Sequence, residues 1–87
     1  MGRYRLVFKK SVAKDLRVLS KKDVARILEC FDALQADPRA QGCEKLSGRD
    51  RYRVRQGVYR VVYEIQDDEQ LVVVVKVGHR RDAYRRT

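Results

Sequence analysis

The clearest pattern in the chain is an alternation of apolar and polar residues between positions 52 and 65. It reads Tyr-Arg-Val-Arg, pauses at Gln56-Gly57, and resumes as Val-Tyr-Arg-Val-Val-Tyr-Glu-Ile. A period of two predicts two strands that each have one apolar and one polar face. If Gln56-Gly57 is a two-residue hairpin loop, Arg53 lies opposite Arg60.

The two faces of this predicted hairpin differ in chemistry. The residues expected to pack on helices are Tyr52, Val54, Tyr59, Val61, Tyr63 and Ile65. The open face carries Arg53, Arg55, Arg60, Val62 and Glu64. Like charges directly opposite each other are unfavourable, so the arginines cost stability unless an anion lies between them. The alternative is a solvated surface on which the arginines splay apart.

Two helices are predicted before the hairpin. A short strand at Tyr4–Phe8 comes first, and Ser11 is expected to cap a helix with apolar positions four and three residues apart. Ser20 is expected to cap a second helix, which Pro38 ends because proline lacks the amide donor. With almost no loop between them, the helices are predicted to form an antiparallel hairpin. The apolar positions are Val12, Leu16 and Leu19 in the first helix and Val24, Ile27, Leu28, Phe31 and Leu34 in the second.

The remaining segments complete an α+β fold. Residues 39–51 are a polar connector, residues 67–69 form an acidic turn, and residues 71–77 are apolar on both faces, as in a central strand. The pattern leaves open which face of that strand carries which side chains. We therefore predict a single domain over residues 1–87, with the order β-α-α-β-β-β. It has an N-terminal strand, a two-helix hairpin and a three-stranded antiparallel sheet covered by the helices on one face. Residues 82–87 are expected to form a last helical turn or a tail.

Charge adds a functional direction to this fold. The 87 residues include 21 Lys and Arg against 12 Asp and Glu, a formal net charge of +9. This excess predicts attraction to nucleic acid or to an acidic protein. No apolar run approaches the roughly 20 residues of a membrane span, and no signal peptide is apparent. Cys30 and Cys43 lack metal-ligand spacing, so we expect reduced thiols, no metal or cofactor, and a cytoplasmic protein.

The order of one strand, two helices and three strands, together with four short motifs, resembles the RelE/ParE toxin superfamily of toxin–antitoxin systems, and its RelE branch most. The motifs are Lys-Leu-Ser-Gly at 45–48, Tyr-Arg-Val-Arg at 52–55, Gly-Val-Tyr-Arg-Val-Val-Tyr at 57–63 and Val-Gly-His-Arg at 77–80, continuing to Tyr84. The resemblance implies a ribosome-dependent, metal-free endoribonuclease that inhibits translation. In such an enzyme the 2′-hydroxyl of messenger RNA attacks the adjacent phosphate. The partner implied is an acidic, partly disordered antitoxin, encoded next to the toxin.

The resemblance also implies roles for particular residues. The family's basic pair falls on Arg53 and Arg55, its phosphate-binding arginines on Arg60 and Arg80, and its late tyrosine on Tyr84. The set expected to bind RNA phosphate is Arg53, Arg55, Arg60, Arg80 and Arg81. The set expected to act in catalysis is Arg53, Arg55, Arg60, His79, Arg80 and Tyr84.

One departure from RelE concerns proton transfer. RelE has lysines at the positions of Arg53 and Arg55, and arginine is a poor proton shuttle near neutral pH. The candidates for this step are His79, with a suitable intrinsic pKa, Tyr84 as an acid, and Glu64 as a base if it stays on the open face. Two other functions remain open. One is a ParE-like toxin that acts on DNA gyrase without nuclease activity, and the other is an RNA-binding module without catalysis.

Overall fold

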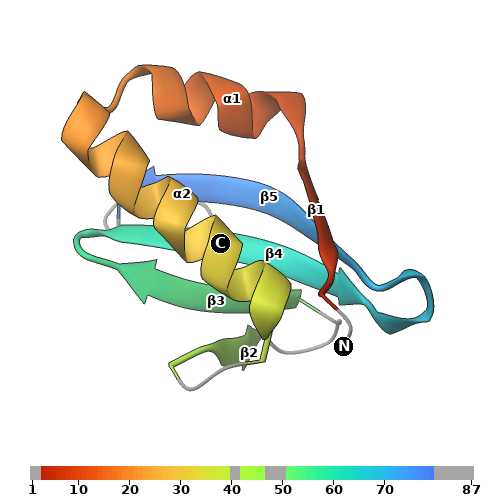
Figure 1. Ribbon diagram of the computed structural model, residues 1–87. Coiled ribbons are helices and arrows are strands. Elements are labelled where there is room, and N and C mark those ends of the chain that lie inside the picture. Colours follow the sequence, from red (N-terminus) through yellow and green to blue (C-terminus); the bar gives the residue numbers. More distant parts are fainter. Residues whose placement is uncertain (1–2, 40–41, 47–50, 80–87) are drawn as a thin grey trace.

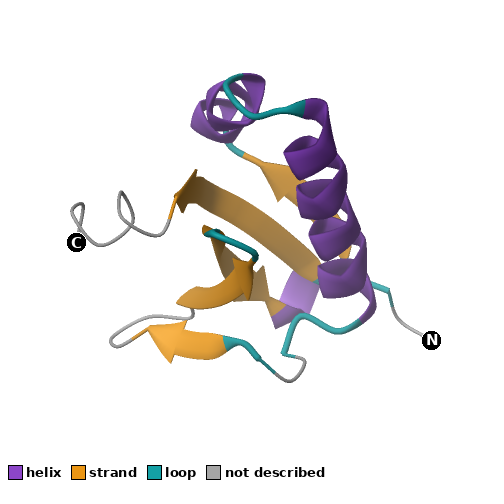
Figure 2. Cartoon of the chain, turned by 90° about the vertical axis from the view of Figure 1, so that its left-hand side faces the viewer, coloured by secondary structure: helices purple, strands orange, loops and turns teal. Residues whose placement is uncertain are grey.

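The computed structural model describes residues 3–39, 42–46 and 51–79. Two helices lie on one side of a five-stranded mixed sheet (Figures 1 and 2). The sheet has the order β1-β5-β4-β3-β2. The elements are β1 (Arg5–Phe8), α1 (Lys10–Arg17), α2 (Lys21–Ala36), β2 (Glu44–Leu46), β3 (Arg51–Gln56), β4 (Tyr59–Gln66), the 3₁₀ turn η1 (Asp67–Glu69) and β5 (Leu71–His79).

The predicted three-stranded antiparallel sheet is therefore wrong, because both ends of the sheet carry a further strand. β1 pairs in parallel with β5 through Arg5–Phe8 and residues 71–74. β2 pairs antiparallel with β3. Unpaired strand edges leave backbone donors and acceptors unsatisfied, and these two short strands cover them. β2 is too short and too polar to show any alternation within the connector.

The helix boundaries were predicted correctly for α2 but not for α1. Ser20 accepts a hydrogen bond from the Asp23 amide at 3.2 Å, and α2 ends at Ala36, before Pro38. The predicted cap at Ser11 is wrong, because α1 begins at Lys10. The Lys9 amide still donates to Val74 O in the sheet, at 3.1 Å. The chain thus turns directly from β1 into the helix, before Ser11 is reached.

The two helices cover different parts of the sheet. In Figure 1, α1 runs along β5, whereas α2 crosses β4 and β3 obliquely. Asp15 of α1 reaches the part of β5 that extends beyond β1. It accepts a hydrogen bond from the Val77 amide at 3.3 Å and lies 3.5 Å from Lys76 Nζ. A side chain of α1 thus satisfies an edge amide of the sheet.

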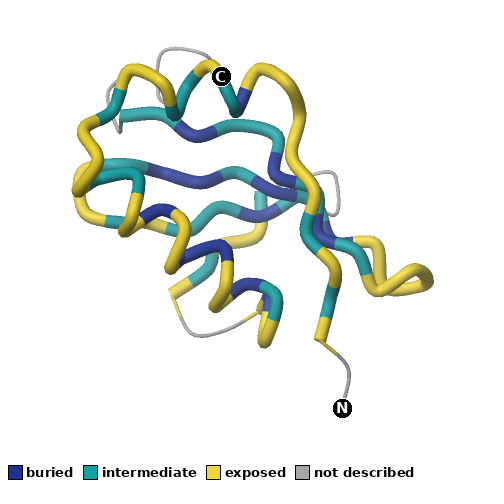
Figure 3. The backbone as a smooth tube through the Cα atoms, turned by 45° about the horizontal axis from the view of Figure 1, so that its top comes forward, coloured by how far each residue is buried: buried dark blue, intermediate teal, exposed yellow. Residues whose placement is uncertain are grey.

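The core lies between the helices and the sheet (Figure 3). The expected apolar face of the hairpin is confirmed, since four of its six residues are buried and Val54 and Tyr59 pack against them. The buried apolar residues are Val12, Ile27, Cys30, Phe31, Leu34, Tyr52, Val61, Tyr63, Ile65, Val72, Val74 and Val77. No helix among the described residues has the length and apolar character needed to cross a membrane.

The β3–β4 hairpin turns one residue later than predicted. Its loop is Gly57-Val58, so Arg55 lies opposite Arg60 and Arg53 lies opposite Val62. Gly57 has φ of +63°, a value that suits glycine at the first loop position of a II′ turn. A loop at Gln56-Gly57 would favour positive φ at Gln56 too, which a residue with a side chain resists. Moving a two-residue loop by one position shifts the cross-strand partners by two residues, from Val58 to Arg60 opposite Arg55. Every side chain therefore stays on its predicted face.

A register shift in β5 decides which side chains lie on each face. Val62 pairs with Lys76, but the next residue, Tyr63, pairs with Val74, so one residue of β5 is extra. Such a bulge reverses the alternation of all later residues. It places Val77 in the core and Gly78 opposite Arg60.

Candidate functional site

The candidate site is an arginine face, formed by Arg53, Arg55 and Arg60 on the face of the sheet opposite the core residues of the same strands. Arg55 and Arg60 are direct cross-strand partners, and Arg53 lies two residues further along β3. Arg60 is only 3% exposed, whereas Arg55 is exposed. On its other side, Arg60 has Gly78 as its β5 partner.

Two carboxylates accompany arginines on this side of the sheet. Glu44 of β2 accepts two hydrogen bonds from Arg53, at 2.6 Å from Nη2 and 3.2 Å from Nε. Glu64 of β4 accepts two from its partner Arg51, at 2.6 and 3.2 Å. Neither Glu44 nor Arg51 was singled out from the sequence. The only sequence feature that pointed to them was the polar connector, which contains Glu44 and ends at Arg51.

Glu44 lies in the field of the whole arginine face. Hydrogen bonds from Arg53, the charge of Arg53, and then the charges of Arg55 and Arg60 hold the pKa of Glu44 below its ordinary value. A shallow groove of about 390 Å³ runs along this part of the sheet and is lined by Gly42, Glu44, Arg53, Val54 and Arg55. The groove thus has one carboxylate and two guanidinium groups in its wall.

His79 lies apart from the arginine face. It is the cross-strand partner of Tyr59, and the two rings meet edge to face with centroids 5.9 Å apart. Tyr59 belongs to the helix-covered face, and its hydroxyl donates to Asp23 of α2 at 3.0 Å. The bulge in β5 therefore separates His79 from Arg60, although the two residues are on neighbouring strands.

The other predicted site residues fall into two groups. Glu64 lies on the open face as predicted, but in an ion pair with Arg51. Arg80, Arg81 and Tyr84 lie outside the described residues. The structure thus brings together three of the predicted arginines, and the catalytic assignments themselves remain predictions.

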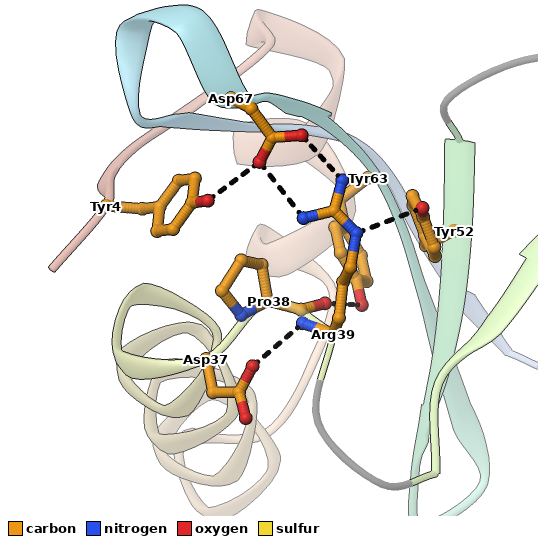
Figure 4. Close-up of polar contacts among 7 residues, drawn as sticks. All are labelled: Tyr4, Asp37, Pro38, Arg39, Tyr52, Tyr63 and Asp67. Carbon is orange, nitrogen blue, oxygen red and sulfur yellow. Dashed lines mark hydrogen bonds and ion pairs between the residues drawn. The ribbon is translucent and has the colours of Figure 1, made fainter. Parts of the chain in front are cut away.

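A second polar cluster lies at the end of the sheet that is remote from the β3–β4 turn (Figure 4). Arg39, which follows α2, donates to both carboxylate oxygens of Asp67, at 3.0 and 2.8 Å. It also donates to the Tyr52 hydroxyl at 3.2 Å, and Tyr4 donates to Asp67 at 2.7 Å. Hydrogen bonds from Arg39 and then Tyr4 lower the pKa of Asp67 to about 2. This cluster joins the segment after α2 to the β4–β5 turn and to Tyr4, the residue before β1.

Comparison with known proteins assigns the fold to a family. Residues 4–84 match the family described as the ParE toxin of the type II toxin–antitoxin system parDE. Toxin RelG of Mycobacterium tuberculosis is 33% identical over 87 residues, covering 95% of this chain and 98% of RelG. Among solved structures, the archaeal RelE–RelB complex from Pyrococcus horikoshii has a TM-score of 0.83 at 33% identity, with 90% of this chain and 96% of that chain covered. The isolated Escherichia coli RelE toxin has a TM-score of 0.75 at 26% identity, with 95% and 97% covered.

The chain therefore belongs to the RelE/ParE family of type II toxins and is RelE-like. This confirms the family predicted from the sequence motifs. It is a toxin of a type II toxin–antitoxin system.

Proposed function

We propose that this toxin is a ribosome-dependent endoribonuclease that cleaves messenger RNA by attack of a 2′-hydroxyl on the adjacent phosphate. The observation that carries the proposal is the direct pairing of Arg55 and Arg60 on a face that neither helix covers. Cationic side chains on directly opposed residues form a positively charged surface, and such a surface attracts an anion. The substrate would be cytoplasmic, and we place the toxin there.

The arginine face suits one part of this reaction in particular. As the 2′-oxygen attacks, negative charge builds up on the phosphorane oxygens, and fixed cations nearby lower the energy of that state. Arg60 suits this role because a guanidinium stays charged and can bind two oxygens at once. Arg55, which is more exposed, would bind the incoming phosphate from the groove side.

The residue that removes the 2′-proton is a separate matter. Glu64 must first leave its ion pair with Arg51 before it can act as the base. His79 packs against Tyr59 on the helix-covered face, so it would have to reach RNA past the end of β5. The roles proposed for Arg80, Arg81 and Tyr84 rest on the resemblance to RelE.

The test is cleavage of a defined messenger RNA with and without ribosomes, with the RNA ends mapped. We expect cleavage that requires ribosomes and leaves a 2′,3′-cyclic phosphate or its hydrolysis product, because the 5′-oxygen leaves. Messenger RNA that stays intact in both conditions would contradict the proposal. RNA that is bound by the protein but not cut is the outcome expected of an RNA-binding module without catalysis.

A second candidate function is inhibition of DNA gyrase. The family match favours it, because the family that matches residues 4–84 is described as the ParE toxin of a type II system. A gyrase supercoiling assay separates the two functions. Inhibition of supercoiling at toxin concentrations that leave ribosome-bound RNA intact would support the second candidate.

We also propose that an acidic antitoxin, encoded next to the toxin and partly disordered when free, neutralises it. Solved relatives include the RelE–RelB complexes of Pyrococcus horikoshii and Escherichia coli. The net charge of +9 supports an acidic partner. Co-expression with the product of the adjacent reading frame should yield a stable complex that no longer cleaves RNA. Failure of the two proteins to copurify at low salt would contradict this.

A further inference from the structure

The carboxylate of Glu44 binds the arginine face in the manner of an external anion. Both hydrogen bonds from Arg53, from Nη2 and from Nε, end on the same oxygen, Oε1. The Nε–Nη2 edge of a guanidinium is one of the edges that grips phosphate oxygens bidentately. While Glu44 holds it, this edge of Arg53 is not available to RNA.

The contact is more than a local pair. The charges of Arg55 and Arg60 also stabilise the ionised form of Glu44, as the lowered pKa indicates. Glu44 lines the same groove as Arg53 and Arg55. One carboxylate therefore partly neutralises the three cations to which the nuclease proposal assigns phosphate binding.

The pair is also exposed enough to be reversible. The Glu44 side chain is 61% exposed, whereas that of Arg53 is 22% exposed. An ion pair with one solvated partner is weak, and a polyanion with several phosphates can displace it. β2, which carries Glu44, has only three residues and pairs with a single neighbouring strand, so within the described part of the chain the arginines are the main contacts that hold this carboxylate in place.

We propose that Glu44 is an internal competitor for the phosphate site, which RNA must displace from Arg53 in order to bind. The inference rests on the proposed function of the arginine face and adds a regulatory element to it. Glu44 thereby weakens binding of free anions, such as pyrophosphate or a short oligoribonucleotide. It has less effect on a substrate that is held elsewhere by the ribosome.

The test compares Glu44→Gln with Asp32→Asn in the full chain. Both variants remove one carboxylate from an exposed ion pair, and Asp32 pairs with Arg3 at 2.7 Å, away from the arginine face. Two probes are titrated at fixed low salt. One is a labelled 2′-O-methyl oligoribonucleotide, which cannot undergo 2′-attack, followed by fluorescence anisotropy. The other is inorganic pyrophosphate, followed by the NMR signals of the arginine side chains.

We expect Glu44→Gln to bind the oligonucleotide about three- to fivefold more tightly, and Asp32→Asn to change binding less than twofold. Adding Arg53→Gln to Glu44→Gln should abolish the gain. In ribosome assays, Glu44→Gln should lower KM with kcat unchanged. Equal gains in both variants, no gain, or a fall in kcat would each overturn the proposal.

Failure of the proposed function gives a different result. If the protein is not a nuclease, no variant cleaves RNA, yet pyrophosphate should still bind Glu44→Gln more tightly than the unaltered protein. If the protein does cleave RNA but pyrophosphate binding is the same in both, the internal competitor is refuted and the nuclease proposal stands.

Discussion

Arg55 and Arg60 face each other directly across β3 and β4, with Gly78 on the far side of Arg60. Like charges on directly opposed residues are unfavourable for stability, and here one of the two residues, Arg60, is buried. Interactions that cost stability in a small domain are often found at functional sites. The pair is therefore the natural place to test both the activity and the stability of this toxin.

Replacing Arg60 should abolish most RNA cleavage. We expect Arg60→Ala to lower the rate about 10²–10³-fold, the loss seen when one donor to a developing oxyanion is removed. Arg60→Lys should recover part of it, because lysine keeps the charge but not the bidentate fork. Cleavage rates on programmed ribosomes give the measurement.

Two further variants separate catalysis from folding. Arg60→Met keeps the volume of the buried stem and should be as inactive as Arg60→Ala. Arg17→Ala, on α1 and on the other side of the sheet, should cleave at the normal rate. An Arg60→Met protein that is folded and fully active would contradict the assignment.

Removing one charge of the pair should stabilise the fold. Arg55→Gln relieves a directly opposed like-charge contact and should raise the free energy of unfolding by about 0.2–1 kcal/mol. Arg55→Lys keeps the charge and should give no such increase. Urea unfolding at low salt measures both. A stabilised but less active Arg55→Gln protein is the expected result, and a destabilised one would show that favourable contacts of Arg55 outweigh its repulsion with Arg60.

Asp67 should make stability depend on pH under acid conditions. Its pKa in the folded protein, about 2, is below its ordinary value of 3.8, because Arg39 and Tyr4 donate to the ionised carboxylate. The contribution is therefore complete above about pH 4 and is lost as the pH falls towards 2. In urea unfolding between pH 2 and 7, Asp67→Asn should be less stable at pH 7, with the difference vanishing near pH 2.

Asp68 provides the control for this experiment. It lies next to Asp67 in the same turn, and Asp68→Asn removes an equal charge outside the Arg39–Tyr4 cluster. We expect it to leave the pH profile of the unaltered protein in place. Identical profiles for the two variants would assign the effect to net charge.

The buried Tyr63 hydroxyl should matter more than the hydroxyl of Tyr59. Tyr63 is fully buried and donates to Pro38 O at 2.7 Å, where α2 has just ended. Tyr63→Phe leaves that carbonyl without its donor and should cost about 1–3 kcal/mol of unfolding free energy. Tyr59→Phe should cost less, because Asp23 is only partly buried and water can replace the hydroxyl. Equal losses in thermal or urea unfolding would contradict this ranking.

The two serines that precede the helices in the predicted fold allow a test of capping. Ser20→Ala removes the acceptor for the Asp23 amide and should cost about 1 kcal/mol. Ser11→Ala should have little effect, because Ser11 is inside α1 and is exposed. Urea unfolding of the two variants side by side provides the comparison.

Several features could be predicted from local sequence because their causes are local. The cap at Ser20 and the stop at Pro38 depend on residues within one helical turn, and both are found. The separation of Tyr52 from Arg53 onto opposite faces depends only on strand alternation, so it survived an error in the hairpin register. The sequence motifs also identified the toxin family correctly.

What the sequence by itself determined is which side chains of the β3–β4 hairpin share a face, because alternation along a strand without a bulge is a property of the backbone alone. Only the tertiary structure decided which of those side chains meet. The turn at Gly57 set Arg55 against Arg60, the bulge in β5 moved His79 to Tyr59, and the pairing of β2 brought Glu44 to Arg53. Each of these depends on contacts between strands, where a shift of one residue costs little locally but changes every neighbour across the sheet.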